Sequence, residues 1–219
     1  MSDPSRPRRA AAGDGLLILG LVGRAGSGKS SVARALVARG AQLLDADRIG
    51  HEVTDGDPEV REALLAEYGP AAYLDDGTLN RRLVATMVFS SPAALASLNR
   101  LVHPRILSRL REGIAALAAE ARPAVVVVDA ALMLDWGFER ECDAVIAVTA
   151  PEESRVARLV AARGWTEAET RRRLDAQKPD TYFTGAADDV IENAGSEAGL
   201  ADAVDAVLAR VRARAAGRA

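Results

Sequence analysis

Residues 16–30 read LLILGLVGRAGSGKS, an apolar run followed directly by closely spaced glycines, a lysine and a serine. The continuous apolarity of the first half is typical of a strand covered on both faces, as in a parallel sheet. Gly23, Gly28, Lys29 and Ser30 match the pattern G-x-x-x-x-G-K-[ST], in which backbone N–H groups and a helix N-terminus surround a phosphate. The stretch therefore predicts a phosphate-binding loop between a buried strand and a helix.

A glycine-rich turn without a ligand is the alternative interpretation of this stretch. The chain has only two lysines among its 28 basic residues, Lys29 and Lys178, so a chance match that includes a lysine is rare. The strand before the loop and the helical pattern after it also favour nucleotide binding. In that interpretation Lys29 contacts the outer phosphates and the Ser30 hydroxyl is a ligand of Mg²⁺.

Size and composition place the 219-residue chain among ordinary globular proteins. The formal net charge of −3 gives no support to nucleic-acid binding through an overall basic field. The single cysteine, Cys142, excludes an internal disulfide and is expected to be a small buried hydrophobe. Residues 1–14 lack the apolar core of a secretory signal, and no apolar run is long enough to span a membrane. We expect a disordered tail at 1–14, no membrane association, and a cytoplasmic monomer or weak homo-oligomer.

Apolar, β-branched runs alternate with helical patterns along the rest of the chain, which is typical of an α/β fold. The predicted strands are 16–22, 41–45, 124–129, 143–149 and 188–192. The predicted helices are 29–39, 59–68, 80–89, 93–119, 152–163, 167–177 and 197–214. We therefore predict a parallel five-stranded sheet flanked by helices, the P-loop NTPase fold. The stretch from about 50 to 120 has no convincing strand, which indicates a helical insertion that binds substrate.

Carboxylates stand at the ends of two predicted strands, where the ligands of parallel sheets gather. Asp45 and Asp47 follow the second strand, and Asp129 ends the third. One carboxylate of the pair can accept a proton from an attacking hydroxyl while the other holds Mg²⁺. Asp129 occupies a Walker B position, from which it can hold Mg²⁺ through water. The alternatives are structural: a helix cap by Asp47, a solvated Asp45, and an Asp129 that caps the segment after its strand.

The sequence disfavours a conventional GTPase, because the motif with which that class recognises guanine is absent. Residues 47–50, DRIG, match the D-x-x-G pattern of that class only superficially. The N-K-x-D motif is absent, because the two lysines follow Gly28 and Gln177.

The chain resembles the dephospho-CoA kinase family, small P-loop kinases that perform the last step of coenzyme A biosynthesis, over about residues 16–213. The resemblance rests on the order and spacing of several motifs rather than on any one of them. These motifs are GLVGRAGSGKS (20–30), DAD (45–47), DGTLNRRLVATMVF (76–89), LNRLVHP (98–104), RLVAAR (158–163), AQ (176–177) and ADDVIENAG (187–195).

The resemblance implies that ATP phosphorylates the 3′-hydroxyl of dephospho-CoA, with Mg²⁺, to give coenzyme A and ADP. It implies that Asp47 is the general base on this hydroxyl and that Lys29 is the second catalytic residue. Arg81 and His103 would face the acceptor substrate; for His103, a histidine satisfied at a helix break before Pro104 is the alternative. The implied nucleotide site comprises Gly23, Gly26, Ser27, Gly28, Lys29, Ser30, Ser31, Arg158, Arg163 and Asn193, and the implied metal site comprises Ser30, Asp45 and Asp129.

With this resemblance we predict one kinase domain over residues 15–213. Its parts are a core (15–49, 120–150 and 186–213), a helical substrate-binding insertion (50–119) and a helical lid (151–185), and a short tail (214–219) follows the domain. In the lid, Arg158 and Arg163 would contact the phosphates of ATP, with a solvated helix face as the alternative. Asn193 would lie on the adenine side.

Three segments depart from the family pattern. Arg24 stands in the phosphate-binding loop where the family has glycine, ALMLD (131–135) replaces PLLFE, and YFTG (182–185) stands where the family has basic residues. Lys178 could substitute for those basic residues from earlier in the loop. Two other functions are therefore kept open: another small-molecule P-loop kinase, and a nucleotide-sensing protein that has lost turnover.

Overall fold

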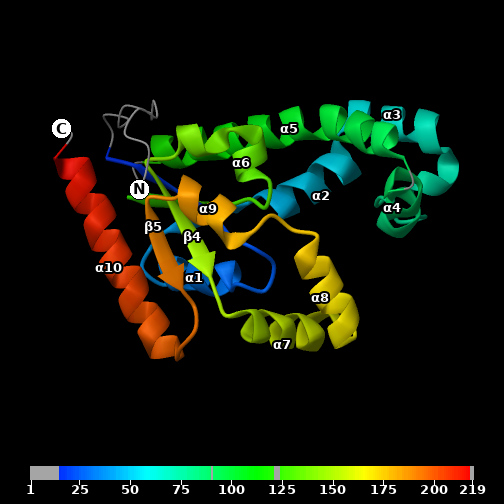
Figure 1. Ribbon diagram of the computed structural model, residues 1–219. Coiled ribbons are helices and arrows are strands. Elements are labelled where there is room, and N and C mark those ends of the chain that lie inside the picture. Colours follow the sequence, from blue (N-terminus) through cyan, green and yellow to red (C-terminus); the bar gives the residue numbers. More distant parts are fainter. Residues whose placement is uncertain (1–14, 90, 121–123, 218–219) are drawn as a thin grey trace. The chain divides into compact units, whose positions relative to one another are not determined.

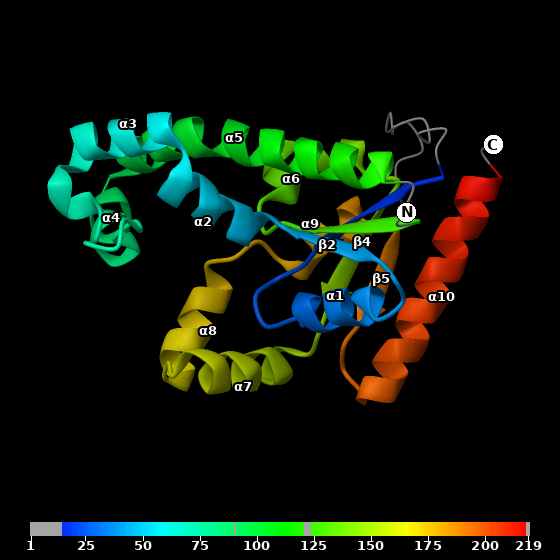
Figure 2. The ribbon, with the colours of Figure 1, turned by 180° about the vertical axis from the view of Figure 1, so that it is seen from behind.

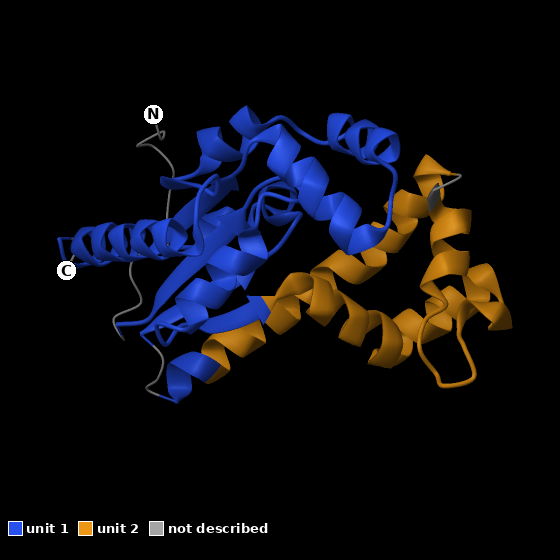
Figure 3. Cartoon of the chain, turned by 90° about the horizontal axis from the view of Figure 1, so that it is seen from below, with its two compact units in different colours: residues 1–44, 117–219 blue, residues 45–116 orange. Residues whose placement is uncertain are grey.

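The computed structural model describes residues 15–89, 91–120 and 124–217, so the predicted tail at 1–14 lies outside the described residues. The chain forms two compact units, residues 1–44 with 117–219 and residues 45–116 (Figure 3). We call them the sheet unit and the helical unit. The helical unit corresponds to the predicted insertion, although it begins and ends earlier in the sequence than 50–119.

The sheet unit is built on a five-stranded parallel sheet, which confirms the predicted fold class. Its strands, in the order β2-β3-β1-β4-β5, are β2 (Gln42–Asp45), β3 (Val125–Asp129), β1 (Leu17–Val22), β4 (Ala144–Thr149) and β5 (Asp189–Glu192). Every residue of β1 is buried, as its continuous apolarity predicts, and Leu21 is paired with Asp129 of β3. The carboxyl ends of β1, β3 and β4 therefore lie at one edge of the sheet.

Two helices, α1 (Lys29–Val37) and α10 (Glu197–Ala216), lie side by side along the sheet (Figures 1 and 2). They cover one face of it. Every second strand residue points to that face, and the apolar stripe of each helix packs against these residues. The buried cluster between them includes Leu19, Leu21, Val127, Ile146, Val148, Val32, Leu36, Val204, Val207 and Val211. The side chain of Cys142 is buried, as expected.

The remaining helices of the sheet unit are α6 (Met133–Trp136), α7 (Glu152–Arg163), α8 (Glu167–Asp175) and α9 (Asp180–Ala186), with a 3₁₀ turn, η2, at Phe138–Glu141. Sequence patterning missed α6 and α9, because neither has a side-chain cap and α9 contains Gly185, a poor helix former. The predicted tail at 214–219 is wrong in part, since α10 continues to Ala216.

The helical unit contains α2 (Ala46–Gly56), α3 (Pro58–Tyr68), η1 (Pro70–Ala72), α4 (Arg81–Phe89) and most of α5 (Pro92–Ala119). The expected break of the last helix at Pro104 is wrong, because α5 runs through this proline. A proline inside a helix removes one N–H donor and opens the preceding turn. The Arg105 guanidinium donates to the Leu101 carbonyl oxygen (2.8 Å), which supplies a donor to that turn. No described helix meets the length and hydropathy that a membrane span needs.

Candidate active site

The phosphate loop, residues 23–30, has the backbone that its sequence predicts. Gly23, Gly26 and Gly28 all have positive φ angles, of 145°, 75° and 95°. A Cβ atom on Gly28 would lie 1.9 Å from the Asn193 Nδ2 atom, and one on Gly23 would lie 2.3 Å from the Val148 carbonyl oxygen. Both the backbone conformation and the close packing therefore require glycine at positions 23 and 28.

The polar side chains of the loop suit a bound polyphosphate. Lys29 begins α1, and its ammonium donates to the Gly23 carbonyl oxygen (3.3 Å), so its charge lies over the loop. The Ser27 side chain is fully buried, and its hydroxyl has no hydrogen-bond partner within the described part of the chain. Ser30, in the first turn of α1, is exposed. A lysine, an unsatisfied hydroxyl and a helix N-terminus together fit an anionic ligand.

Arg158 and Asn193 hold the phosphate loop from outside. The Arg158 guanidinium donates to the carbonyl oxygens of Gly26 (3.1 Å), Ser27 (3.2 Å) and Asn193 (3.0 Å). The Asn193 side-chain amide donates to the Ser27 carbonyl oxygen (3.0 Å). Because a trans peptide points its N–H away from its carbonyl, these contacts direct the Gly28 N–H to the other side of the loop. Arg158 is half-buried rather than solvated, whereas Arg163 is exposed in the last turn of α7.

The strand-end carboxylates have different surroundings. Asp129 is the half-buried last residue of β3, and it precedes the short helix α6, whose N-cap residue is Leu132. Asp45 is the N-cap of α2: its Oδ1 accepts from the backbone N–H groups of Asp47 (2.9 Å) and Arg48 (3.0 Å). The alternative that made Asp47 the cap is therefore wrong. The Asp47 side chain is exposed in the first turn of α2.

A protein-only metal centre is not found in the described ranges, where no three His, Cys, Asp or Glu side chains are grouped to hold an ion. A Mg²⁺ ion that takes most of its ligands from nucleotide phosphates and water needs few donors from the protein. In the sheet unit the Ser30 hydroxyl is exposed and the Asp129 carboxylate is half-buried, and both are oxygen ligands of the kind that Mg²⁺ accepts.

Arg81 is held inside the helical unit. Its guanidinium donates to the Asp55 carboxylate (2.9 Å), to the Thr54 hydroxyl (3.3 Å) and to the His51 carbonyl oxygen (3.5 Å), which joins the start of α4 to the end of α2. Burial raises the pKa of Asp55, but hydrogen bonds from Arg81 and the Leu79 N–H outweigh it, so this pKa lies below its usual value. The Asp55 pairing had no signal in the sequence.

His103 lies in α5 immediately before Pro104 and is half-buried. Helix α5 continues through Pro104, so His103 lies inside the helix and not at a helix end. His51 is exposed on α2 and contributes its backbone carbonyl oxygen to the Arg81 contact.

Comparisons with known proteins agree on one family. The family model for dephospho-CoA kinase matches residues 17–199. The chain is 38% identical to a dephospho-CoA kinase of Thermobifida fusca (strain YX) over 90% of this chain and 94% of that protein. It is 39% identical to one of Corynebacterium efficiens over 91% of this chain and 99% of that protein.

Solved structures give the same result for the fold. TT1252 from Thermus thermophilus superposes with a TM-score of 0.75 at 34% identity, over 89% of this chain and 97% of that one. A dephospho-CoA kinase from Campylobacter jejuni, at 20% identity and a TM-score of 0.61, covers 90% of this chain and 98% of its own, and shares the fold. The family match, the relatives' identity and the glycine-built phosphate loop together show that the chain is a phosphotransferase that belongs to the dephospho-CoA kinase family.

Proposed function

We propose that this protein transfers the γ-phosphoryl group of ATP to the 3′-hydroxyl of dephospho-CoA, giving coenzyme A and ADP. The observation that carries the proposal is the phosphate loop, whose glycine conformation and Lys29 charge suit the triphosphate of a nucleotide. Family membership supplies the acceptor. We further propose a cytoplasmic enzyme that acts on small molecules and not on nucleic acid, as a monomer or weak homo-oligomer.

At the nucleotide, the chain supplies charge and alignment. The Lys29 ammonium would neutralise charge on the outer phosphates, and the phosphate-loop N–H groups and the hydroxyls of Ser27 and Ser31 would orient them. Arg158, Arg163 and Asn193 are the proposed contacts beyond the loop. Ser30, Asp129 through water, and Asp45 would hold Mg²⁺, which when bound neutralises phosphate charge and aligns the triphosphate.

At the acceptor, Asp47 would accept the proton of the 3′-hydroxyl. It is a carboxylate in the first helical turn after β2, and the capping of that helix is already performed by Asp45. A general base requires a carboxylate that can approach the reacting hydroxyl, and an exposed one outside the cap meets this condition. Arg81 and His103 are proposed to bind the acceptor within the helical unit.

The test is to incubate purified protein with Mg²⁺-ATP and dephospho-CoA and to measure coenzyme A and ADP by chromatography. We expect one ADP per coenzyme A, and we expect Asp47→Asn to lose turnover while keeping its affinity for ATP. Normal ATP binding without coenzyme A formation would overturn the proposal. A panel of nucleoside and sugar acceptors would then identify another small-molecule kinase, and ATP binding without phosphorylation of any acceptor would identify a nucleotide sensor.

A further inference from the structure

Arg24, the second residue of the phosphate loop, points away from the bulk solvent. Its Nη2 atom donates to the carbonyl oxygen of Leu174, in the last turn of α8. The Arg24 side chain is half-buried, and its Nε atom is fully covered without a hydrogen-bond partner among the described residues. A guanidinium at this place meets the partial negative charge at the C-terminal end of a helix.

A second hydrogen bond runs in the opposite direction. The backbone N–H of Ala25, the next residue of the loop, donates to the Gln177 side-chain oxygen over 3.0 Å. Gln177 follows the C-terminal end of α8. A loop side chain thus binds the helix backbone, and a side chain after the helix binds the loop backbone, so the same two segments are joined twice.

The contacts of α7 complete the attachment. Arg158 holds the carbonyl oxygens of Gly26 and Ser27, and a Cβ atom on Gly26 would lie 2.9 Å from the Arg155 carbonyl oxygen. Helices α7 and α8 pack against each other. The middle of the phosphate loop is therefore fixed by α7, and its beginning is fixed by α8 through Arg24 and Gln177.

We infer that Arg24 and Gln177 are positioning residues that lock the phosphate loop to the end of α8. The inference rests on the proposed function only for its kinetic consequences. Displacing α8 would break both hydrogen bonds, one of which has a charged donor and is therefore the stronger. The pair thus fixes the conformation of the phosphate loop and keeps α8, a helix of the predicted lid, beside it. A lid in that place would exclude water from the phosphoryl transfer.

The first experiment needs no substrate. Hydrogen exchange of the nucleotide-free protein is compared among wild type, Arg24→Met, Gln177→Leu and the double variant. Arg212→Met serves as the matched control, since Arg212 is exposed on α10, away from the loop and α8. We expect faster amide exchange in residues 165–178 and in the phosphate loop for Arg24→Met, Gln177→Leu and the double variant. The increase in the double variant should differ from the sum of the two single increases, because both residues join the same two segments.

The second experiment separates positioning from direct chemistry. We expect Arg24→Met to raise the KM for ATP about tenfold, the lower end of the effect of one lost charge-assisted hydrogen bond, with kcat changed less than twofold. Hydrolysis of ATP per coenzyme A formed should rise in the same variant. Arg24→Lys, which keeps the charge and one donor, should recover most of the wild-type KM.

Unchanged exchange in Arg24→Met, or an unchanged KM for ATP, would overturn the inference. A large loss of kcat at constant KM would also overturn it, because Arg24 would then act on the transferred phosphoryl group itself. Thermal melting of every variant identifies any that fails to fold, and if Arg24→Met does not fold, Gln177→Leu carries the test. If wild type makes no coenzyme A while exchange responds as expected, the proposed function fails and the positioning role stands.

Discussion

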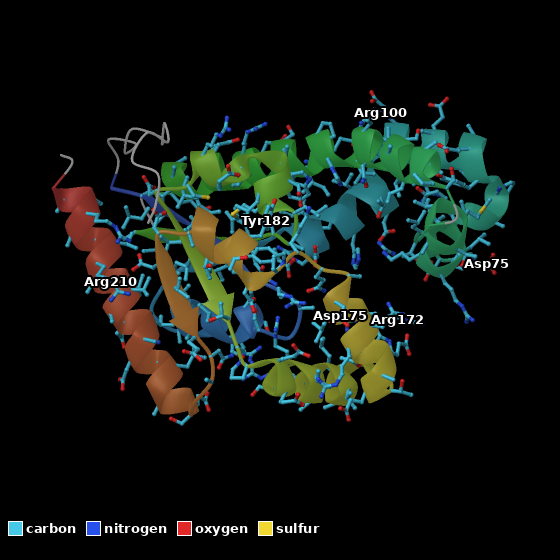
Figure 4. The ribbon with its side chains drawn as sticks, viewed as in Figure 1. Asp75, Arg100, Arg172, Asp175, Tyr182 and Arg210 are labelled. Atoms are coloured by element: carbon cyan, nitrogen blue, oxygen red, sulfur yellow. The ribbon has the colours of Figure 1, made fainter. Side chains whose placement is uncertain are left out.

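The hydroxyl of Tyr182 in α9 donates a hydrogen bond to the Asp135 carboxylate of α6 over 3.3 Å. Both residues lie in segments where the sequence departs from its family pattern, so two of the departures contact each other in the folded chain. Lys178, considered as a substitute for the missing basic residues, has its ammonium 5.6 Å from the centre of the Tyr182 ring. Figure 4 shows Tyr182 on α9 and Asp175 and Arg172 on α8.

Loss of the Tyr182 hydroxyl should destabilise the protein only slightly. Tyr182→Phe removes one hydrogen bond to an exposed carboxylate and keeps the edge contact with the Phe183 ring. We expect the free energy of unfolding to fall by about 0.5 kcal/mol, measured in urea. A loss several times larger would show that the contact between α6 and α9 depends on this bond.

High pH should also weaken the fold. Burial raises the pKa of Tyr182, with a further contribution from Asp135, and burial likewise raises the pKa values of Tyr68 and Tyr73. A raised folded-state pKa means that the stabilisation is complete below the ordinary value of 10.0 and is lost as pH rises through the folded-state value. We expect unfolding free energy to decline above pH 10, and less steeply in Tyr182→Phe than in wild type.

Asp55 should make the protein sensitive to acid. Its folded-state pKa lies below the ordinary value of 3.8, so its stabilisation is present above that value and is lost as pH falls through the folded-state one. We expect Asp55→Asn to flatten the fall in unfolding free energy between about pH 5 and pH 2. Asp75→Asn is the matched control, since Asp75 is exposed in the same unit (Figure 4). An equal flattening in both variants would contradict the Arg81 pairing.

Gly28→Ala should abolish ATP binding and destabilise the fold. The new Cβ would lie 1.9 Å from Asn193 Nδ2 at a φ of 95°, so both strain and collision arise. Gly40→Ala isolates the strain, because Gly40 has a φ of 87° with nothing within 4 Å of the new atom. We expect about 1 kcal/mol for Gly40→Ala and clearly more for Gly28→Ala, by urea unfolding and ATP titration. Equal costs would show that Asn193 moves aside freely.

Substitutions of Asp45 and Asp47 should affect different properties of the protein, its stability and its turnover. Asp45→Ala removes the cap of α2 and is expected to cost about 1 kcal/mol of stability, whereas Asp47→Asn should leave stability unchanged. Asp45→Asn keeps a capping oxygen while removing the charge. If Asp45 also holds Mg²⁺, this variant should need more Mg²⁺ for half-maximal activity at unchanged stability. An unchanged Mg²⁺ requirement would leave Asp45 with the cap alone.

The sequence by itself determined the strands, their parallel sheet and the phosphate loop. These features follow from local rules: continuous apolar runs form buried strands, and glycines at fixed spacing permit positive φ before a helix. The predicted ends of the long helices differ from the observed ones by a few residues. Periodicity locates the body of a helix well, whereas the signals at its termini are weaker. The short helices α6 and α9 were missed because they have little periodicity of their own and depend on packing against the rest of the unit.

Only the tertiary structure decided where the side chains of the loop and its surroundings point. Arg24 binds Leu174, Arg158 binds the loop carbonyls, and Asp135 binds Tyr182, all between residues distant in sequence. Such contacts depend on how the helices pack on the sheet, which local propensity does not encode. The sequence therefore determined which residues form the phosphate loop, and the packing of α7 and α8 against it decided what holds that loop in place.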